Sequence, residues 1–334
     1  MNLETYTTPD AFDALRAEWN PLLERSGSNL VFLTHEWLQT WWDVYQPGDL
    51  WVIVGRTDDG QLAGIAPWFI QQQEERRVVR AIGCVEVTDY LSVIADREHE
   101  QAYFTALSDH LAATEDVFDA IGLCNIPTES PTLALLPDLL QARGFTVTTE
   151  VQEVCPLVPL TGDWEDYLSR LDKKQRHEVR RKLRRAHATT AWHITGPDAD
   201  ISAATEQFLH LMAASSPDKA VFLQDEQNEA FMRAIILRMW EAGWLQLTFL
   251  TVNSDPAATY LNFDYNNRVL VYNSGQDVTQ YGALSPGIVL LAHTIRHAID
   301  SGREVFDFLR GNEPYKYQMG GQDTQIHELT ATRP

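Results

Sequence analysis

Apolar residues recur along this chain with two spacings, one of three to four residues and one of two. The first spacing is typical of a helix with one buried face, and the second of a strand with one buried face. Helices are predicted at residues 10–26, 34–45, 98–113, 131–143, 164–171, 173–186, 199–215 and 225–242. Strands are predicted at residues 51–55, 62–70, 77–82, 90–94, 118–124, 145–160, 245–252, 258–265, 268–274 and 325–332.

Residues 285–321 are predicted to form a helix, a buried strand and a polar loop. Ser285 suits the N-cap of the helix and Pro286 its first position. The strand over 305–309 carries an acid, Asp307, within an apolar run. The loop after it holds five reactive side chains: Arg310, Glu313, Tyr315, Lys316 and Tyr317. Functional residues are often found where a buried strand ends and a loop begins, so this segment is the first candidate site.

The two halves of the chain repeat one order of elements, namely helices, antiparallel strands, a helix and a strand. A chain of 334 residues also suits two domains better than one, and we place them at residues 1–155 and 156–334. The fold class predicted is a mixed α/β (α+β) fold. In each domain we expect a mixed, mostly antiparallel sheet flanked by helices.

The composition of the chain indicates the cellular compartment in which the protein is expected. The sequence contains no apolar run long enough to span a membrane, and its first residues lack the pattern of a secretory signal. We therefore expect a cytoplasmic protein. The three cysteines, Cys84, Cys124 and Cys155, form no CxxC pair and are expected to be buried free thiols.

Charge is distributed unevenly along the chain. The formal net charge is −21, which argues against DNA as a partner because the average surface repels phosphate. Residues 173–185, in contrast, contain eight Lys or Arg and one acid. Such a segment indicates a local site for an anionic group, and it would also permit peripheral contact with a membrane surface.

Several motifs resemble one known family. Phe32–Leu38 is similar to its early F-x-T-x-x-W-L helix start, and residues 173–181 are similar to its basic helix. Residues 284–287 and 306–311, followed by Tyr315-Lys316, are similar to its C-terminal signature. The chain thus resembles the double-domain GNAT-like acyltransferases, which include the CelD-type cellulose-biosynthesis proteins and are related to the Fem peptidoglycan aminoacyltransferases.

The resemblance implies two tandem GNAT-like domains, with the donor site in the second. It also implies transfer of an acyl group from acyl-coenzyme A or acetyl-coenzyme A to a primary amine of a small-molecule, lipid-precursor or cell-envelope acceptor. One alternative is a Fem-like aminoacyltransferase that uses aminoacyl-tRNA, which the basic helix favours and the overall acidity disfavours. A second alternative is a non-catalytic binding protein with a decayed donor site.

The start of the predicted helix at Ser285 is the candidate for binding the donor. Helix N-termini present free N–H groups to phosphates, so Ser285 and Gly287 are predicted to bind the coenzyme. Arg310, which abuts a glycine, is predicted to recognise an anionic group of the same ligand. Residues 280–287 match the glycine-rich coenzyme loop of GNAT enzymes, although Pro286 removes one amide donor. The alternative is a capped helix without a ligand.

The catalytic candidates follow the buried strand. Burial of Asp307 would make it a usable base, and Glu313 in the loop is an equal candidate for that role. By resemblance, Lys316 would stabilise the oxyanion or contact a phosphate, and Tyr315 would protonate the leaving thiolate. Each of these residues also has a purely structural interpretation.

The basic helix supplies two candidates for binding substrate or phosphate, Arg176 and Arg180, which lie four residues apart on one face. A solvated helix paired with acidic neighbours is the alternative. His293 and His297 have a spacing that can hold a metal, but the sequence offers no third ligand, so no metal is expected.

Overall fold

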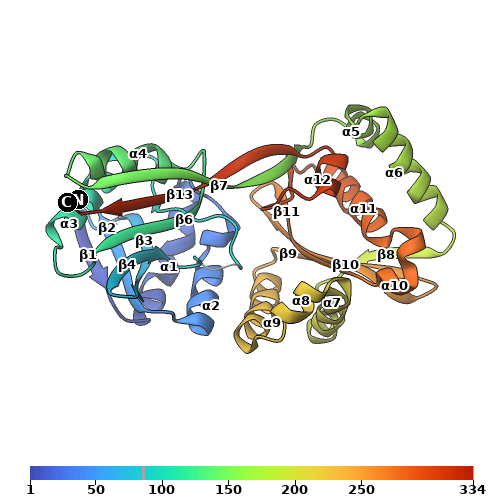
Figure 1. Cartoon of the computed structure of the whole chain (residues 1–334), viewed down its shortest axis with the longest axis horizontal. Helices are drawn as coiled ribbons and strands as arrows, with labels where there is room; N and C mark the ends of the chain where they lie inside the picture. The colour runs from blue at the N-terminus through green and yellow to red at the C-terminus, as the bar shows by residue number, and fades with distance from the viewer. Residues whose placement is uncertain (85–86, 334) are drawn as a thin grey trace. The chain divides into compact units, whose positions relative to one another are not determined.

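The computed structural model describes residues 1–84 and 87–333, which form two compact units (Figure 1). The first unit comprises Met1–Val154 and the C-terminal segment from Thr324, and the second comprises Cys155–Asp323. From the sequence we place residues 324–334 in the second domain, whereas in the structure these residues belong to the first unit. The reason is that the final strand pairs with a strand of the first unit.

The first unit consists of strands that carry helices on both faces. Its helices are α1 (Asp10–Arg25), η1 (Val31–Leu33), α2 (His35–Tyr45), α3 (Glu100–Ala113) and α4 (Pro131–Gln141). Its strands are β1 (Asn2–Tyr6), β2 (Asp49–Arg56), β3 (Leu62–Gln73), β4 (Arg76–Ala81), β5 (Ile94–Ala95), β6 (Ala120–Pro127) and parts of β7 (Thr146–Pro159) and β13 (Gln322–Thr332). Large aromatic side chains such as Trp19, Trp37 and Trp68 fill its core.

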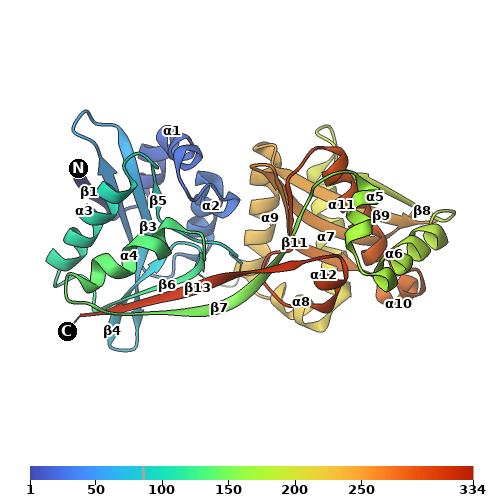
Figure 2. The ribbon, with the colours of Figure 1, turned by 90° about the horizontal axis from the view of Figure 1, so that it is seen from above.

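The strand order in the first unit is β1-β2-β3-β4-β6-β13-β7, and Figure 2 shows β13 between β6 and β7. Strands β1 to β4 are mutually antiparallel, whereas β4 and β6 run parallel. The predicted strand at 90–94 is wrong except at its end, since only Ile94–Ala95 pairs, with β3.

Two of the three cysteines differ from the prediction. Cys84 and Cys124 form a disulfide, and their Cα atoms lie 6.1 Å apart. They meet because β4 and β6 are parallel neighbours, so Cys84, shortly after the end of β4, lies beside Cys124 within β6 and in the range of a disulfide. Cys155 is buried and takes part in no disulfide within the described residues, which agrees with the prediction.

The second unit is also a sheet between two layers of helices (Figure 1). Its helices are α5 (Trp164–Arg170), α6 (Lys173–Ala186), α7 (Ile201–Ser215), α8 (Pro217–Phe222), α9 (Glu226–Glu241), α10 (Val278–Tyr281), η2 (Gly282–Leu284), α11 (Pro286–Asp300) and α12 (Pro314–Gln318). Its strands are β8 (Thr190–Ile194), β9 (Leu245–Val252), β10 (Asp255–Tyr265), β11 (Arg268–Gln276), β12 (Val305–Asp307) and the end of β7. Helices α7, α8 and α9 lie on one face of this sheet, and α5, α6 and α11 on the other.

The strand order in the second unit is β7-β12-β11-β10-β9-β8. Strands β8 to β11 are antiparallel neighbours, whereas β11 and β12 run parallel and are connected through α11. Both units therefore repeat one plan of antiparallel strands followed by a parallel pair, which confirms the predicted fold class. Within the described ranges, no helix is both long and apolar enough to cross a membrane.

Candidate active site

The two parallel strands of the second unit pair over a short distance and then separate. Their register joins Arg268 to Val305, Val269 to Phe306 and Leu270 to Asp307. Beyond Leu270, β11 continues to Gln276, whereas β12 ends at Asp307. In the described residues, the last part of β11 therefore has no pairing with β12, and we call this side of β11 its free edge. This opening at the end of a parallel pair is where the candidate residues gather.

Lys316 holds the loop after β12 in place. Its side chain is only 2% exposed, and its Nζ donates hydrogen bonds to the carbonyl oxygens of Leu309 (3.2 Å), Arg310 and Gly311 (3.1 Å). Nζ also lies 3.0 Å from Oε2 of Glu313. An ammonium group has three protons to donate, so these four acceptors saturate it. This geometry favours a positioning role for Lys316 over a direct one at the oxyanion.

Asp307 is buried and contacts both the backbone of the loop and a side chain of β11. Its carboxylate is 1% exposed and accepts a hydrogen bond from the N–H of Leu309 at 2.8 Å. Leu309 has φ 56°, a conformation that costs energy for a residue with a branched side chain. Asp307 Oδ2 also lies 3.9 Å from Nη1 of Arg268. These contacts favour the structural interpretation of Asp307, which supports the strained turn of the loop.

Tyr315 and Glu313 lie at the start of α12, on the opening. The Tyr315 ring packs edge-on against Phe308, and burial together with the Glu313 carboxylate raises the pKa of Tyr315. Burial and Tyr315 in turn raise the pKa of Tyr260 on β10. A phenol with a raised pKa donates hydrogen bonds but is a weak acid, so the geometry favours Tyr315 as a hydrogen-bond donor over a proton donor to a thiolate.

Sequence reasoning missed one ionisable residue of this opening, Lys219. It lies on α8, and its Nζ donates hydrogen bonds to the carbonyl oxygen of Ser274 (2.5 Å) and to Ser274 Oγ (3.4 Å). Burial lowers the pKa of Lys219 to about 8, although the Glu313 carboxylate acts in the opposite direction. No sequence signal predicted it, because α8 is too short to show helical periodicity.

Gly275 explains how α8 reaches β11. A Cβ atom at this position would lie 2.4 Å from the backbone of Leu211 and of Met212. Helix α7 therefore packs directly against the β11 backbone, and α8 follows it after a single residue, Ser216. The Ser216 side chain accepts a hydrogen bond from the N–H of Lys219 and so caps α8.

The start of α11 differs from the prediction. Ser285 has φ 54° and ψ 55°, and its side chain makes no capping hydrogen bond. An N-cap residue normally has an extended backbone, which directs its side chain back to the helix. Instead, the Oε1 atom of Gln276 accepts a hydrogen bond from the Gly287 N–H at 3.2 Å, and a Cβ at Gly287 would lie 2.7 Å from that atom. Gly287 thus makes room for a cap from β11.

The loop that matches the coenzyme motif is itself helical. Asp277 caps α10 by accepting from the Gln280 N–H, and the N–H groups of Tyr281 and Ser285 donate to carbonyls within the loop. Pro286 has no N–H group. Most of the amides that would cradle a pyrophosphate are therefore already used, and Asp277 adds a negative charge beside them.

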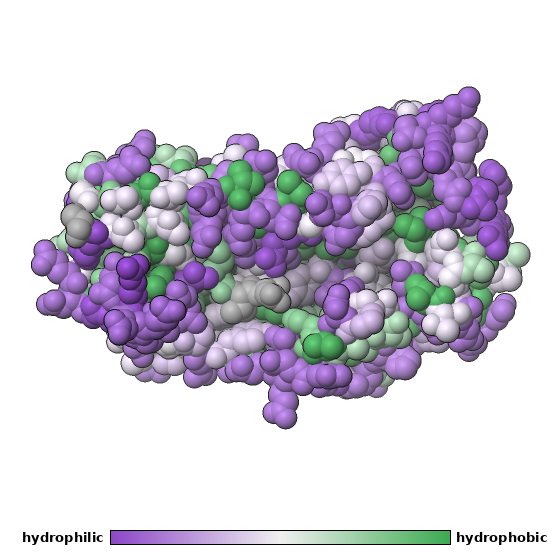
Figure 3. Space-filling view, in the orientation of Figure 1, coloured by the Kyte–Doolittle hydropathy of each residue, from purple (hydrophilic) through white to green (hydrophobic). Residues whose placement is uncertain are grey.

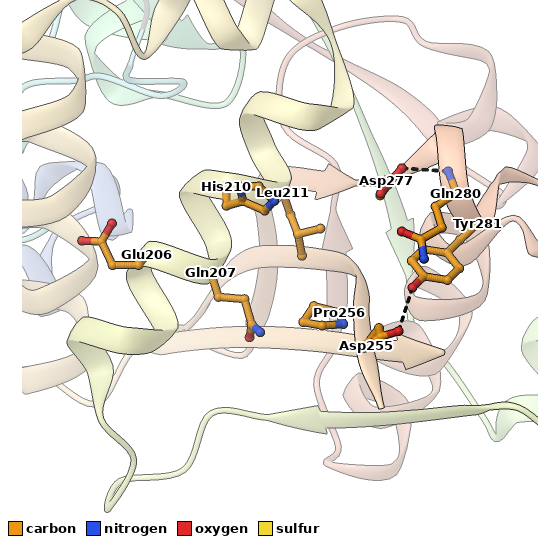
Figure 4. Close-up of a pocket in the computed structure, with 9 residues that line it drawn as sticks. All are labelled: Glu206, Gln207, His210, Leu211, Asp255, Pro256, Asp277, Gln280 and Tyr281. Atoms are coloured by element: carbon orange, nitrogen blue, oxygen red, sulfur yellow. Dashed lines mark hydrogen bonds between the residues drawn. The ribbon is translucent and has the colours of Figure 1, made fainter. Parts of the chain in front are cut away.

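A groove of about 470 Å³ lies next to this loop (Figure 4). Figure 4 shows α7 on one side and the start of β10 with α10 on the other, and a hydrogen bond joins Tyr281 to Asp255. Its lining residues are Glu206, Gln207, His210, Leu211, Asp255, Pro256, Asp277, Gln280 and Tyr281. Three carboxylates make this groove unsuited to the phosphates of a donor.

The basic helix α6 packs against α11 and η2, beside the candidate donor loop. Arg180 pairs with Glu165, and Arg176 donates to the carbonyl oxygen of Ser169, so both predicted phosphate ligands tie α6 to α5. Among the described cations of α6, the exposed ones for which no ion pair is formed are Lys173, Lys174, Arg184 and Arg185. Figure 3 shows hydrophilic side chains over the upper right, where α6 lies in Figure 1.

The two helical histidines have an aromatic partner. His293 stacks on Trp192 with ring centroids 5.3 Å apart, and His297 meets the same ring edge-on. The side of α11 that carries the two histidines is thus partly covered by β8. In the described residues, no group of three or more His, Cys, Asp or Glu side chains is arranged to hold a metal.

The chain is similar to a known family in its second half. A family model described as an acetyltransferase (GNAT) domain matches residues 173–317. This range contains α6, the strands from β8 to β12, and the opening with Lys219, Glu313 and Tyr315. The predicted likeness to GNAT acyltransferases is therefore confirmed for residues 173–317. No curated protein matches the chain in sequence.

Solved structures extend the likeness to the whole fold. FemX superposes with a TM-score of 0.70 at 13% identity, over 99% of this chain and 97% of that one. L-PGS from Bacillus licheniformis has a TM-score of 0.56 at 11% identity, over 98% and 92%. The C-terminal domain of a putative lysylphosphatidylglycerol synthetase from Agrobacterium fabrum has a TM-score of 0.52 at 10% identity, over 93% and 91%. At these identities the likeness concerns the fold alone.

Proposed function

We propose, from the premise that residues 173–317 are a GNAT acetyltransferase domain, that the chain is an N-acyltransferase acting on a primary amine. Acyl-coenzyme A is the donor in this proposal. The acceptor is an amine of a small molecule, a lipid precursor or the cell envelope. The amine attacks the acyl carbon directly, and no covalent enzyme intermediate takes part.

The observation that carries the proposal is the separation of β11 and β12 beyond Leu270 and Asp307. A separated strand pair leaves a free backbone edge on β11, and an extended acyl donor can lie along such an edge. Tyr315 and Glu313 lie at the same place, where a hydrogen-bond donor and a carboxylate can orient the carbonyl group and the amine.

The roles of the remaining predicted residues follow from their contacts. Lys316 and Asp307 position the loop after β12, while Arg310 lies within that loop. Ser285 and Gly287 form the start of α11, against which the donor phosphates would approach. The exposed cations of α6 add positive charge beside that approach.

A second candidate is transfer from aminoacyl-tRNA. Two observations favour it. Amides of the 277–287 loop are already hydrogen-bonded within the protein, and α6 carries exposed cations. A polyanionic donor needs surface cations more than it needs an amide cradle. Likeness in fold to FemX is compatible with either donor.

A binding panel with free coenzyme A, acyl-coenzyme A of increasing chain length and aminoacyl-tRNA tests these candidates. Mass action predicts that the true donor raises the free energy of unfolding by about 2.7 kcal/mol at a hundredfold excess over Kd. Each donor that stabilises the chain is then incubated with a mixture of primary amines, and amide formation is measured by mass spectrometry.

The outcomes separate the candidates. Stabilisation by acyl-coenzyme A with amide formation supports the first proposal. Stabilisation by aminoacyl-tRNA alone, weakening steeply with salt, replaces it with the second. If a donor binds and no amine is acylated, the chain is a binding protein.

A further inference from the structure

We propose that Lys219 is a catalytic residue of the transfer reaction and accepts the proton that the attacking amine releases. The inference rests on the proposed acyl transfer and goes beyond it, because the predicted bases were Asp307 and Glu313. Asp307 is buried and accepts a hydrogen bond from the Leu309 N–H, and Glu313 lies within ion-pair distance of Lys316. Both contacts stabilise the ionised carboxylates, which directs attention to Lys219 as the group that takes up the proton.

The position of Lys219 is set by three features of the fold. Ser216 and Pro217 start the short helix α8, and Gly275 lets α7 lie against the β11 backbone. The ammonium group then reaches Ser274, in the part of β11 that has no β12 partner. Lys219 thus lies at the free edge along which the acyl donor is proposed to bind.

The charges around Lys219 suit a group that exchanges a proton near neutral pH. Burial lowers the pKa of Lys219 to about 8, so a substantial share of it is neutral at physiological pH. Glu313, at the start of α12, is the one charged group that acts on this pKa among the described residues. The same carboxylate acts on Tyr315, which places Lys219, Glu313 and Tyr315 around one region.

The proton balance is complete without a further reactant. The amine nitrogen forms a bond to the acyl carbon, and the tetrahedral intermediate gives one proton from that nitrogen to neutral Lys219. The carbon–sulfur bond then breaks, and its electron pair leaves with the sulfur. Lys219 returns the proton to the thiolate, so the products are an amide and a free thiol.

The test combines variants with a measurement that needs no donor. Lys219→Arg keeps the positive charge but cannot release its proton, and Lys219→Met removes both properties. Asp218→Asn, an exposed neighbour on the same helix, is the matched control. Reactivity of Lys219 toward acetic anhydride is followed across pH by mass spectrometry, since only the neutral amine reacts.

Four results are expected. Lys219 reactivity has its midpoint near pH 8, and the wild-type rate rises with pH through the same value as Lys219 loses its proton. Lys219→Arg and Lys219→Met lower kcat by about a hundredfold or more, the usual size of general base catalysis, and change KM little. Asp218→Asn has the wild-type rate.

Two results would overturn the role of Lys219 and leave the proposed function unaffected. One is a wild-type rate in Lys219→Arg, which would show that a fixed charge suffices. The other is a reactivity midpoint near 10, as in an ordinary lysine. A wild-type chain that acylates no amine with any donor would instead overturn the proposed function, and this inference with it.

Discussion

Two lysines with contrasting environments define the candidate site at the scale of single residues. Lys316 was predicted from its motif, yet its ammonium group is saturated by three carbonyls and Glu313. Lys219 belongs to no motif, yet burial depresses its pKa at the edge of the opening. Sequence reasoning could name Lys316 because its neighbours form a signature. It could not find Lys219, whose partner Ser274 is 55 residues away.

Replacing Lys316 with Met should destabilise the second unit. The change removes the Lys316 donor from the buried carbonyl oxygen of Leu309 and from the part-buried ones of Arg310 and Gly311, and a buried group left unsatisfied costs about 1–3 kcal/mol. Chemical denaturation measures the loss. Glu313→Gln is the matched control, since its exposed side chain contributes about 0–1 kcal/mol through the ion pair. Equal stability of the wild type and Lys316→Met would contradict the positioning role.

At the scale of elements, the contact of α7 with β11 decides where α8 lies. The sequence predicted α7 and β11 from their periodicities, because each pattern is local. It did not predict α8, which has six residues and no buried one, or the edge strand β8, which is short and half-exposed. The positions of α8 and β8 are determined by packing against longer neighbouring elements.

Replacing Gly275 with Ala tests that contact. The added Cβ would lie 2.4 Å from the α7 backbone, so either the helix or the strand must move. Overpacking of this kind costs about 1–3 kcal/mol, and the shift should also separate Lys219 from Ser274 and slow acyl transfer. Thermal unfolding and the transfer assay measure both effects. Gly196→Ala, at a position with open space around it, should change neither.

At the scale of the whole molecule, the C-terminal strand returns to the first unit. Strand β13 pairs with β6, and Ile326, Leu329 and Ala331 are almost completely buried. Arg333 lies over the rings of Phe118 and Phe145. The first unit is therefore completed by the last residues of the chain.

Deleting residues 324–334 should destabilise the first unit more than the second. The deletion exposes the edge of β6 and removes buried apolar side chains, each of which contributes about 1.5–3 kcal/mol when fully buried. Hydrogen exchange should then show a larger loss of protection in β4 and β6 than in β9 and β10. Uniform protection in both units of the shortened chain would mean that β13 does not support the first unit.

The sequence by itself determined the elements whose patterns are local, and its motifs determined the likeness of residues 173–317 to a GNAT domain. Helix α6 and strand β9 begin and end at the predicted residues, because one helical stripe or one short apolar run is complete within each segment. Only the tertiary structure decided that Gln276 caps α11, that Cys84 meets Cys124, that β13 joins the first unit and that Lys219 reaches Ser274. Each of these contacts joins residues distant in sequence, so it depends on how the elements pack and leaves no periodic signal in the chain.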